Sequence, residues 1–557
     1  MFDKFFFKIE TWLSHYGKYV VLASWIFILA FHLSLACDEL ANSLGGDNAH
    51  YLMLALSLAS GKGYRDLNLP GEPYHTHYPF LFPLFLSPFA KLKRQVFYSH
   101  IFIQLLASVI PLVALAWFRF LKRSRIESLM FYFFTATIPV YFYSSISILT
   151  EQLFILLMYI MLFLCLYYRK KKIDFYKVII LVVLLLGLYY TRTVGIVIGL
   201  AFVLGIFLEK DYRKKRIFYL PVPVWIGILF IIGVLPWQIW TKTVGTHTYL
   251  KEFFLKSPYN IDLGRIEPID LLYRLKRNIK FYYPLLGDFI NIARFGRKPE
   301  QIFSIIVYLI SLVGIYVSIR KKQYHLPLIF VLYLLIILVW PFNEQRFIIP
   351  LYLIEAYFFL LGLEYILKFI PRLNTALILS MLFLIFSCWQ GWNIGLVWKR
   401  YQKPLLQPSS PIEVKGYGKF SRPVIDLAKY PGYWSRPKIF LLTKIDLAIL
   451  MNIAKETLPK DAVILTYNPR ITWFYTRRKT VRMLFTLDEK KQWENVEKNG
   501  VNYVLVDPLQ PRLYQFIFKN PERLQFVYGI WRTKSALFKL KPKESEPKQE
   551  QSHILNK

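Results

Sequence analysis

Residues 178–208 read VIILVVLLLGLYYTRTVGIVIGLAFVLGIFL, and Arg192 is the one charged side chain in this stretch. Two apolar runs, 178–190 and 194–208, share a short turn centred on Arg192. At 1.5 Å per helical residue, each run covers about 20 Å of a hydrocarbon layer that is about 30 Å thick. The stretch therefore predicts a hairpin of two short membrane helices. Its arginine lies below the outer surface, where it faces protein, water or an anion, or extends to the interface.

Similar apolar runs fill most of the chain before Lys399, and 55% of all residues are hydrophobic, with a mean hydropathy of +0.36. Soluble domains contain about 45–50% apolar residues, so the excess predicts a membrane protein. We expect a mainly α-helical, polytopic bundle with about eleven spans. The expected spans are Tyr19–Cys37, Tyr98–Phe120, Ile126–Tyr143, Gln152–Tyr168, Val178–Tyr190, Val194–Leu208, Ile217–Trp240, Ile302–Ile319, Leu326–Trp340, Phe347–Phe369 and Thr375–Trp392.

The charges of the short loops predict the orientation of these spans. Basic residues cluster in every second short loop, as at Arg169–Lys172 and Lys210–Arg216, whereas the short loops between them offer only Arg192 and Arg346. Cytoplasmic loops carry the excess of Lys and Arg in membrane proteins, so the N-terminus is expected in the cytoplasm. Three long segments are then expected outside the cytoplasm: 38–97, 241–301 and the residues after Asn393.

The domain boundaries follow changes in composition. Residues 1–18 alternate aromatic and charged side chains and predict an interfacial helix, and residues 19–398 form the expected membrane domain. Apolar strand patterns alternate with helical ones in 399–540, which predicts a soluble, extracytoplasmic α/β domain with a partly parallel sheet. We expect this domain to act as a cap or to recognise the acceptor. The polar residues 541–557 predict a disordered tail.

The net charge of +35 raises nucleic acid as a partner, but no nucleic-acid motif is present. Most of the basic residues before residue 370 flank apolar runs, so they fit topology and contact with anionic membrane lipids. The loop 241–301 adds a basic field with interleaved tyrosines, which could bind lipid or sugar. We therefore expect membrane lipids and no nucleic acid as partners.

The first expected outer loop carries the most distinctive chemistry. Gly45-Gly46-Asp47 opens a predicted helix that includes Tyr51, and an acid after two glycines allows a ligand close approach to the backbone. A carboxylate at this position also serves as an ordinary helix cap. Further along come the stretches Gly61-Lys62-Gly63-Tyr64-Arg65 and His75-Thr76-His77-Tyr78-Pro79.

Taken together, the order of these motifs resembles the polytopic glycosyltransferases of the GT-C superfamily. The resemblance is greatest to the branch of glycosyltransferase family 39 type, with the protein O-mannosyltransferases and the lipid A aminoarabinose transferase. It extends to Ser147–Leu153, Tyr190–Arg192 and Arg346–Pro350. The resemblance implies transfer of a sugar from a polyprenyl-phosphate donor to an acceptor hydroxyl outside the cytoplasm. In that family the matching acid, Asp47, is the essential carboxylate.

Each candidate residue is expected to have a role in that transfer. Asp47 would be the general base of an inverting displacement, and cations would stabilise charge on the departing phosphate. For the donor phosphate we expect Arg192, Arg346 and His77; for the substrates we expect Tyr51, Arg65, His75 and Glu151. Many relatives have Lys where His77 stands, and Glu151 could instead stabilise its helix start.

A metal is the alternative reading of the two histidines. His75 and His77 are close on an extended chain and could bind a divalent ion, for which Glu151 is a candidate third ligand. No cofactor is therefore firmly expected.

Two other function classes remain open at this stage. A transporter or flippase of lipid-linked sugars would also be polytopic and basic, although such proteins tend to contain internal repeats, which this sequence lacks. A non-catalytic envelope assembly protein is the second alternative. An oligosaccharyltransferase would carry a Trp-Trp-Asp motif, which is absent here. No motif identifies the sugar, or selects lipid, protein or glycan as the acceptor.

Overall fold

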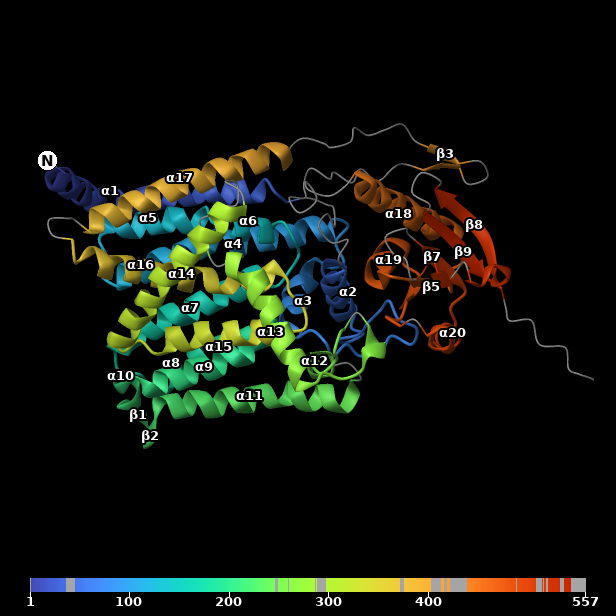
Figure 1. The fold of residues 1–557 in the computed structure, drawn as a ribbon, viewed down its shortest axis with the longest axis horizontal. Coiled ribbons are helices and arrows are strands. Elements are labelled where there is room, and N and C mark those ends of the chain that lie inside the picture. Colours follow the sequence, from blue (N-terminus) through green and yellow to red (C-terminus); the bar gives the residue numbers. More distant parts are fainter. Residues whose placement is uncertain are drawn as a thin grey trace, which may run out of the picture. The chain divides into compact units, whose positions relative to one another are not determined.

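The computed structural model describes residues 2–36, 46–245, 249–258, 260–285, 287, 297–370, 375–401, 412–414, 418–420, 438–486, 488–506, 513, 515–516, 519–530 and 535–541. These residues form two compact units (Figure 1). The helical unit contains Met1–Asp66, Tyr74–Leu405 and Ala428–Pro431, and the second unit contains Leu67–Pro73, Leu406–Leu427 and Gly432–Lys557. The expected tail 541–557 lies almost wholly outside the described residues.

The helical unit is a bundle in which apolar helices follow one another along the chain (Figure 1). Seven of them are long and apolar enough to cross a membrane, and three shorter apolar helices accompany them in the described part. The chain is a multi-pass membrane protein of mainly α-helical class, as expected, and the count of about eleven spans stays a prediction. The main helices are α1 (Phe2–Leu33), α4 (Gln95–Phe120), α5 (Arg125–Ala136), α6 (Pro139–Ser145), α7 (Glu151–Arg169), α8 (Phe175–Thr191), α9 (Gly195–Leu208), α11 (Val222–Val244), α14 (Arg297–Arg320), α15 (His325–Val339), α16 (Tyr352–Leu367) and α17 (Thr375–Tyr401).

Two expected segments differ in the structure. The interfacial helix 1–18 and the first span form one continuous helix, α1. The expected span Ile126–Tyr143 is instead divided into α5 and α6, because Pro139 stands at the start of α6 and Ile138 before it is extended, with φ −60° and ψ 113°. Proline lacks the N–H that a continuing helix needs and disfavours helical geometry in the preceding residue.

The short hairpin expected in 178–208 is present. Helix α8 ends at Thr191 and α9 begins at Gly195, so Arg192 lies in the turn. The chain reverses so tightly that a Cβ atom on Gly195 would lie 2.5 Å from the backbone nitrogen of Tyr189.

Helices α14 and α16 approach each other through two glycines. A Cβ atom on Gly314 would lie 1.8 Å from the carbonyl oxygen of Phe358, and one on Gly362 would lie 1.9 Å from the carbonyl oxygen of Ile310. Small residues allow membrane helices to pack at short distance, where apolar burial gives no preference over lipid.

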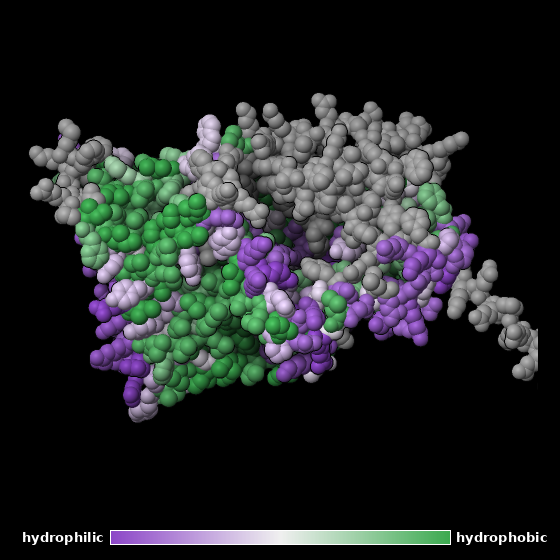
Figure 2. All heavy atoms as spheres, in the orientation of Figure 1, coloured by the Kyte–Doolittle hydropathy of each residue, from purple (hydrophilic) through white to green (hydrophobic). Residues whose placement is uncertain are grey.

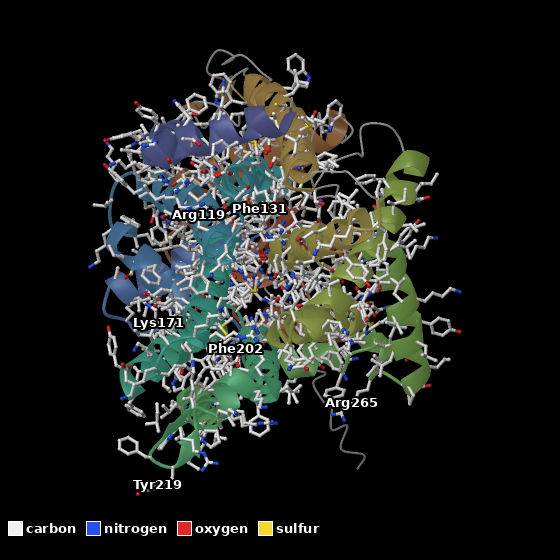
Figure 3. The ribbon with its side chains drawn as sticks, turned by 90° about the vertical axis from the view of Figure 1, so that its left-hand side faces the viewer. Arg119, Phe131, Lys171, Phe202, Tyr219 and Arg265 are labelled. Atoms are coloured by element: carbon white, nitrogen blue, oxygen red, sulfur yellow. The ribbon has the colours of Figure 1, made fainter. Side chains whose placement is uncertain are left out.

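The surface of the helical unit matches its assignment to the membrane. Figure 2 shows a broad hydrophobic area over the helices, with hydrophilic residues gathered at the end that carries α10 (Lys210–Arg213), β1 (Arg216–Ile217) and β2 (Leu220–Pro221). Figure 3 views the unit from this end, where Arg119 and Lys171 are labelled. These are the basic loops that the charge pattern assigned to the cytoplasm.

Short helices gather at the opposite end of the helical unit (Figure 1). They come from the two long loops of the sequence and from the segment between α15 and α16. The elements are α2 (Asp47–Ala59), α3 (Leu81–Leu86), η2 (Ser87–Phe89), α12 (Tyr249–Phe253), η3 (Ile261–Leu263), α13 (Pro268–Tyr282), η4 (Tyr283–Leu285), η6 (Gln345–Phe347) and η7 (Ile349–Leu351).

The second unit is a small α/β domain. Its five-stranded sheet has the order β6-β5-β7-β9-β8; β5 pairs in parallel with β6 and β7, and the remaining pairs are antiparallel. Strands β8 and β9 follow one another in the chain and pair with each other. Asp488 caps α20, since its side chain accepts the backbone N–H groups of Lys490 and Lys491. The elements are β3 (Ile412–Val414), β4 (Gly418–Phe420), α18 (Lys438–Thr457), β5 (Val463–Thr466), α19 (Pro469–Thr476), β6 (Lys479–Arg482), α20 (Glu489–Lys498), β7 (Tyr503–Val506), η10 (Pro521–Arg523), β8 (Leu524–Ile530) and β9 (Ser535–Leu540).

A piece of the first long loop, Leu67–Pro73, belongs to this second unit. The backbone N–H of Thr480 in β6 donates to the carbonyl oxygen of Asn68 at 2.7 Å, and Lys479 Nζ lies 2.7 Å from Glu72 Oε1. The expected boundary at residue 399 does not include this insertion.

Candidate functional site

Asp47 is the first residue of α2. Gly46 precedes it with φ 94°, a left-handed conformation that glycine adopts without strain, and its carbonyl accepts the first helical hydrogen bond from His50 N at 3.0 Å. The N-terminal end of a helix favours a negative charge. The side chain is 24% exposed, so the carboxylate is supported by the helix and still accessible.

Both carboxylate oxygens of Asp47 have a partner. The phenol of Tyr78 donates to Oδ1 at 2.9 Å, and Arg346 Nη2 donates to Oδ2 at 2.8 Å. Arg346 also contacts a second carboxylate, because its Nε lies 2.5 Å from Glu344 Oε2. The predicted base and a predicted phosphate ligand are therefore in direct contact, although 299 residues separate them.

A second carboxylate–arginine pair lies beside the first. Arg192 Nη1 donates to Glu151 Oε1 at 3.0 Å, and the glutamate is only 1% exposed. The ring of Phe347 connects the two pairs, since the guanidinium carbons of Arg192 and Arg346 lie 5.7 and 5.5 Å from its centroid. Glu151 thus neutralises the largely buried Arg192, as well as opening α7.

Tyr51 lies among these charges. Its ring centroid is 5.1 Å from that of Tyr78 and 5.0 Å from that of Phe82. Burial, together with the nearby Tyr78, Asp47 and Glu151, raises the pKa of Tyr51 well above its usual value, so its phenol stays protonated. It can therefore donate a hydrogen bond to an oxygen of a bound substrate.

A third group of polar residues contacts Tyr78, the partner of Asp47. Asp66 lies 2.7 Å from His50 Nε2 and 3.0 Å from His75 Nδ1. Burial opposes the charge of Asp66, but His75 and His50 outweigh it and hold the pKa of that carboxyl well below its usual range. Asp66 is therefore an ionised acceptor for both imidazoles.

His50, Asp66 and His75 are the one group of possible metal ligands among the described residues. One ligand atom from each residue lies within 4.8 Å of the other two. The hydrogen bonds of this group do not fit a metal. The backbone N–H of Tyr78 donates to His75 Nε2 at 2.8 Å, so a neutral ring carries its proton on Nδ1, the atom that faces Asp66. A protonated ring nitrogen has no lone pair to offer to an ion.

The remaining candidates of the first loop lie nearby but have other contacts. His77 Nε2 lies 3.9 Å from Glu252 Oε2 in α12. The guanidinium of Arg65 lies 3.9 Å from the ring centroid of Tyr74, and its Nε donates to the carbonyl oxygen of Lys62. The structure therefore places Arg65 at the base of the loop, where it packs on an aromatic ring.

Two residues of the basic field in 241–301 support the backbone. Arg274 Nη1 donates to the carbonyl oxygen of Phe253 at 2.8 Å, and Arg277 Nη2 donates to that of Pro341 at 2.8 Å. These cations tie α12 and the end of α15 to α13, so a lipid or sugar role is not needed to explain them.

Sequence reasoning assigned no role to four residues that the structure brings to the site: His50, Asp66, Tyr78 and Glu344. The available signal was weak, because each stands in an irregular loop or at a helix start, where spacing does not predict contact. Along α7, Glu151 at one end and Arg169 at the other are 18 positions apart, about 27 Å of helix. The site and the basic loops therefore lie at opposite ends of α7.

Comparison with known proteins identifies the fold. No model of a known protein family matches the sequence, and no curated protein matches it. Solved structures do match. ArnT from Cupriavidus metallidurans bound to undecaprenyl phosphate aligns with a TM-score of 0.54 and 10% identity, covering 94% of this chain and 98% of that one. The chain has the GT-C fold.

A second GT-C structure shows the same likeness. The archaeal oligosaccharyltransferase AglB from Archaeoglobus fulgidus, in complex with an inhibitory peptide and a dolichol-phosphate, gives a TM-score of 0.52 and 11% identity. The alignment covers 89% of this chain and 70% of AglB. The resemblance seen in the motifs is thus confirmed at the level of the fold.

Proposed function

We propose that this chain is a membrane glycosyltransferase that transfers a sugar from a polyprenyl-phosphate donor to an acceptor hydroxyl outside the cytoplasm. One observation carries the proposal: Asp47 and Arg346, a candidate base and a candidate phosphate ligand, meet at 2.8 Å. Two GT-C structures, one bound to undecaprenyl phosphate and one to a dolichol-phosphate, support a lipid-phosphate donor.

The donor phosphate would lie against Arg346 and Arg192, with His77 at the edge of the site. Arginine suits this role because it stays charged and offers several N–H groups to phosphate oxygens. Both guanidinium groups lie within 5.7 Å of the centroid of the Phe347 ring, close enough for both to contact one anion. The polyprenyl tail would remain in the bilayer, which fixes the phosphate at the membrane surface.

Transfer would be a single displacement with inversion. The acceptor oxygen attacks the anomeric carbon, the bond from that carbon to the phosphate oxygen breaks, and the polyprenyl phosphate leaves with the electron pair. The proton of the acceptor hydroxyl goes to Asp47, which acts as general base. Arg346 and Arg192 would stabilise the charge that develops on the departing phosphate.

Donor binding would also prepare the base. Arg346 bonds to Asp47 Oδ2, which makes the carboxylate a weaker proton acceptor. When the phosphate binds Arg346, that oxygen becomes available to the acceptor hydroxyl. Base and donor are therefore coupled through one side chain.

The sugar and the acceptor would meet the neutral and acidic groups of the site. Tyr51 would donate to a substrate oxygen, and Glu151 would accept from a sugar hydroxyl. Its Oε2 is buried and makes no hydrogen bond among the described residues. Arg65 and His75, which the sequence assigned to substrate binding, contact the loop itself in the structure, and we give them supporting roles.

The basic loops at the other end of the bundle support an extracytoplasmic position for Asp47. The residues after α17, including the α/β domain, would then also be extracytoplasmic and could recognise the acceptor. Lipid, protein and glycan hydroxyls all remain candidates.

A transfer assay in detergent tests the proposal against a flippase. Purified protein is mixed with labelled undecaprenyl-phosphate mannose, glucose or 4-amino-arabinose and with extracts of the source membranes. A transferase consumes one of these donors, releases undecaprenyl phosphate and labels an acceptor, although no second leaflet exists. Lack of turnover, together with donor movement across vesicles that contain the protein, would establish the flippase instead.

A further inference from the structure

His75 lies between Asp66 and the backbone of Tyr78, with both ring nitrogens engaged. Its Nδ1 lies 3.0 Å from each oxygen of Asp66, and its Nε2 accepts the N–H of Tyr78 at 2.8 Å. The ring is only 3% exposed. The acceptor role of Nε2 places the proton on Nδ1, and the ionised Asp66 stabilises this tautomer.

The loop that carries His75 is closed by further bonds. Arg65 and Tyr74 form an isolated antiparallel bridge, and the N–H of His75 donates to the carbonyl oxygen of Tyr64 at 2.8 Å. The phenol of Tyr64 lies 3.1 Å from the carbonyl oxygen of Tyr78. The backbone of Tyr78 is therefore held on both sides, at its N–H by His75 and at its carbonyl by Tyr64.

The side chain of Tyr78 extends from this fixed backbone to the candidate base. Its phenol donates to Asp47 Oδ1 at 2.9 Å, and its ring lies 5.1 Å from the rings of both His50 and Tyr51. A chain of contacts thus runs from Asp66 through His75 and Tyr78 to Asp47, all within the first outer loop and α2.

We propose that Asp66 and His75 are positioning residues that hold the Tyr78 phenol on Asp47 and so aim the carboxylate at the acceptor. This proposal rests on the proposed function for its kinetic part. Tyr78 binds Oδ1 and Arg346 binds Oδ2, and the acceptor proton would go to Oδ2 once Arg346 turns to the donor phosphate. Asp66 and His75 do not touch the reacting atoms; they act through Tyr78.

A set of variants at one position separates the two contacts of His75. In His75→Gln, the amide oxygen reaches about as far as Nε2 and can accept the N–H of Tyr78. In His75→Asn, the shorter amide reaches only the place of Nδ1 and can donate to Asp66 but not support Tyr78. His75→Ala removes both contacts.

Two measurements are made on each of these variants. The first is carbodiimide labelling of Asp47 in the purified full-length protein, measured by mass spectrometry without any substrate. The second is steady-state transfer from the labelled undecaprenyl-phosphate sugar that the wild type uses. We expect His75→Asn and His75→Ala to label Asp47 faster and to lower kcat by about 10- to 100-fold, with the KM for donor nearly unchanged. His75→Gln should stay close to the wild type in both readouts.

Equal behaviour of His75→Gln and His75→Asn, in labelling or in kcat, would overturn the proposal. So would stoichiometric zinc or manganese in the purified protein that His75→Ala loses, since a metal site would then replace the hydrogen-bonded chain. If the wild type transfers no sugar but the labelling contrast persists, the proposed function fails while the positioning chain stands.

Discussion

Replacing Asp47 with Asn should tighten the binding of undecaprenyl phosphate while it removes transfer. Arg346 Nη2 bonds to Asp47 Oδ2 at 2.8 Å, and both side chains are about a quarter exposed. Hydrogen bonds to charged groups contribute about 1.5–3 kcal/mol, and partial exposure favours the lower end. A phosphate that must displace this bond therefore loses about 1.5 kcal/mol, which is about a tenfold weaker affinity.

Isothermal titration of the purified protein with undecaprenyl phosphate in detergent measures this effect. We expect Asp47→Asn to bind about tenfold more tightly and Arg346→Gln to bind at least tenfold more weakly than the wild type. Asp262→Asn and Arg265→Gln are matched controls, because both residues are exposed in the second long loop, and they should leave affinity unchanged. Unchanged or weaker binding by Asp47→Asn would refute the competition between carboxylate and phosphate for Arg346.

Three further predictions test the packing of α14 on α16, the Arg192–Glu151 ion pair and the contacts of Lys479. Gly314→Leu should abolish folded protein in detergent size-exclusion chromatography, because even a Cβ atom there would meet a backbone oxygen at 1.8 Å; a monodisperse, stable variant would contradict the α14–α16 contact. Arg192→Gln should lower the thermal midpoint by leaving Glu151 buried without its cation, at a cost of about 3–5 kcal/mol, whereas adding Glu151→Gln should restore stability but not transfer. Lys479→Met should speed proteolysis within Leu67–Pro73, because it removes the bonds from Lys479 to Leu67 and Glu72. An unchanged cleavage rate would show that these bonds do not hold the segment.

Features of the fold that depend on local composition were predictable from the sequence. The hairpin around Arg192 follows from two apolar runs too short for a normal span, and the mainly helical membrane class follows from the same kind of run. The break at Pro139 was visible in principle, since proline interrupts a helix, but the surrounding apolar residues predicted one span. Patterns of hydrophobicity predict which residues are buried more reliably than they predict whether a helix continues without a break.

The site was only partly predictable, because its contacts join distant parts of the chain. Asp47 and Arg346 were each selected, but nothing in a single sequence shows that residues 299 positions apart form an ion pair. Asp66 and Tyr78 are near neighbours of Asp47 in the chain, yet the irregular turns of their loop decide which groups meet. Likewise, the place of Leu67–Pro73 in the second unit depends on one strand edge far along the sequence.

Single-turnover transfer by Asp47→Asn tests the central claim most directly. Wild type, Asp47→Asn and the exposed control Asp262→Asn are incorporated into vesicles with the labelled undecaprenyl-phosphate sugar that the wild type consumes and with the source-membrane acceptor. The account predicts that Asp47→Asn keeps the donor bound but transfers sugar about 10²- to 10⁴-fold more slowly, while Asp262→Asn matches the wild type. Transfer by Asp47→Asn at the wild-type rate, in correctly inserted protein, would contradict it.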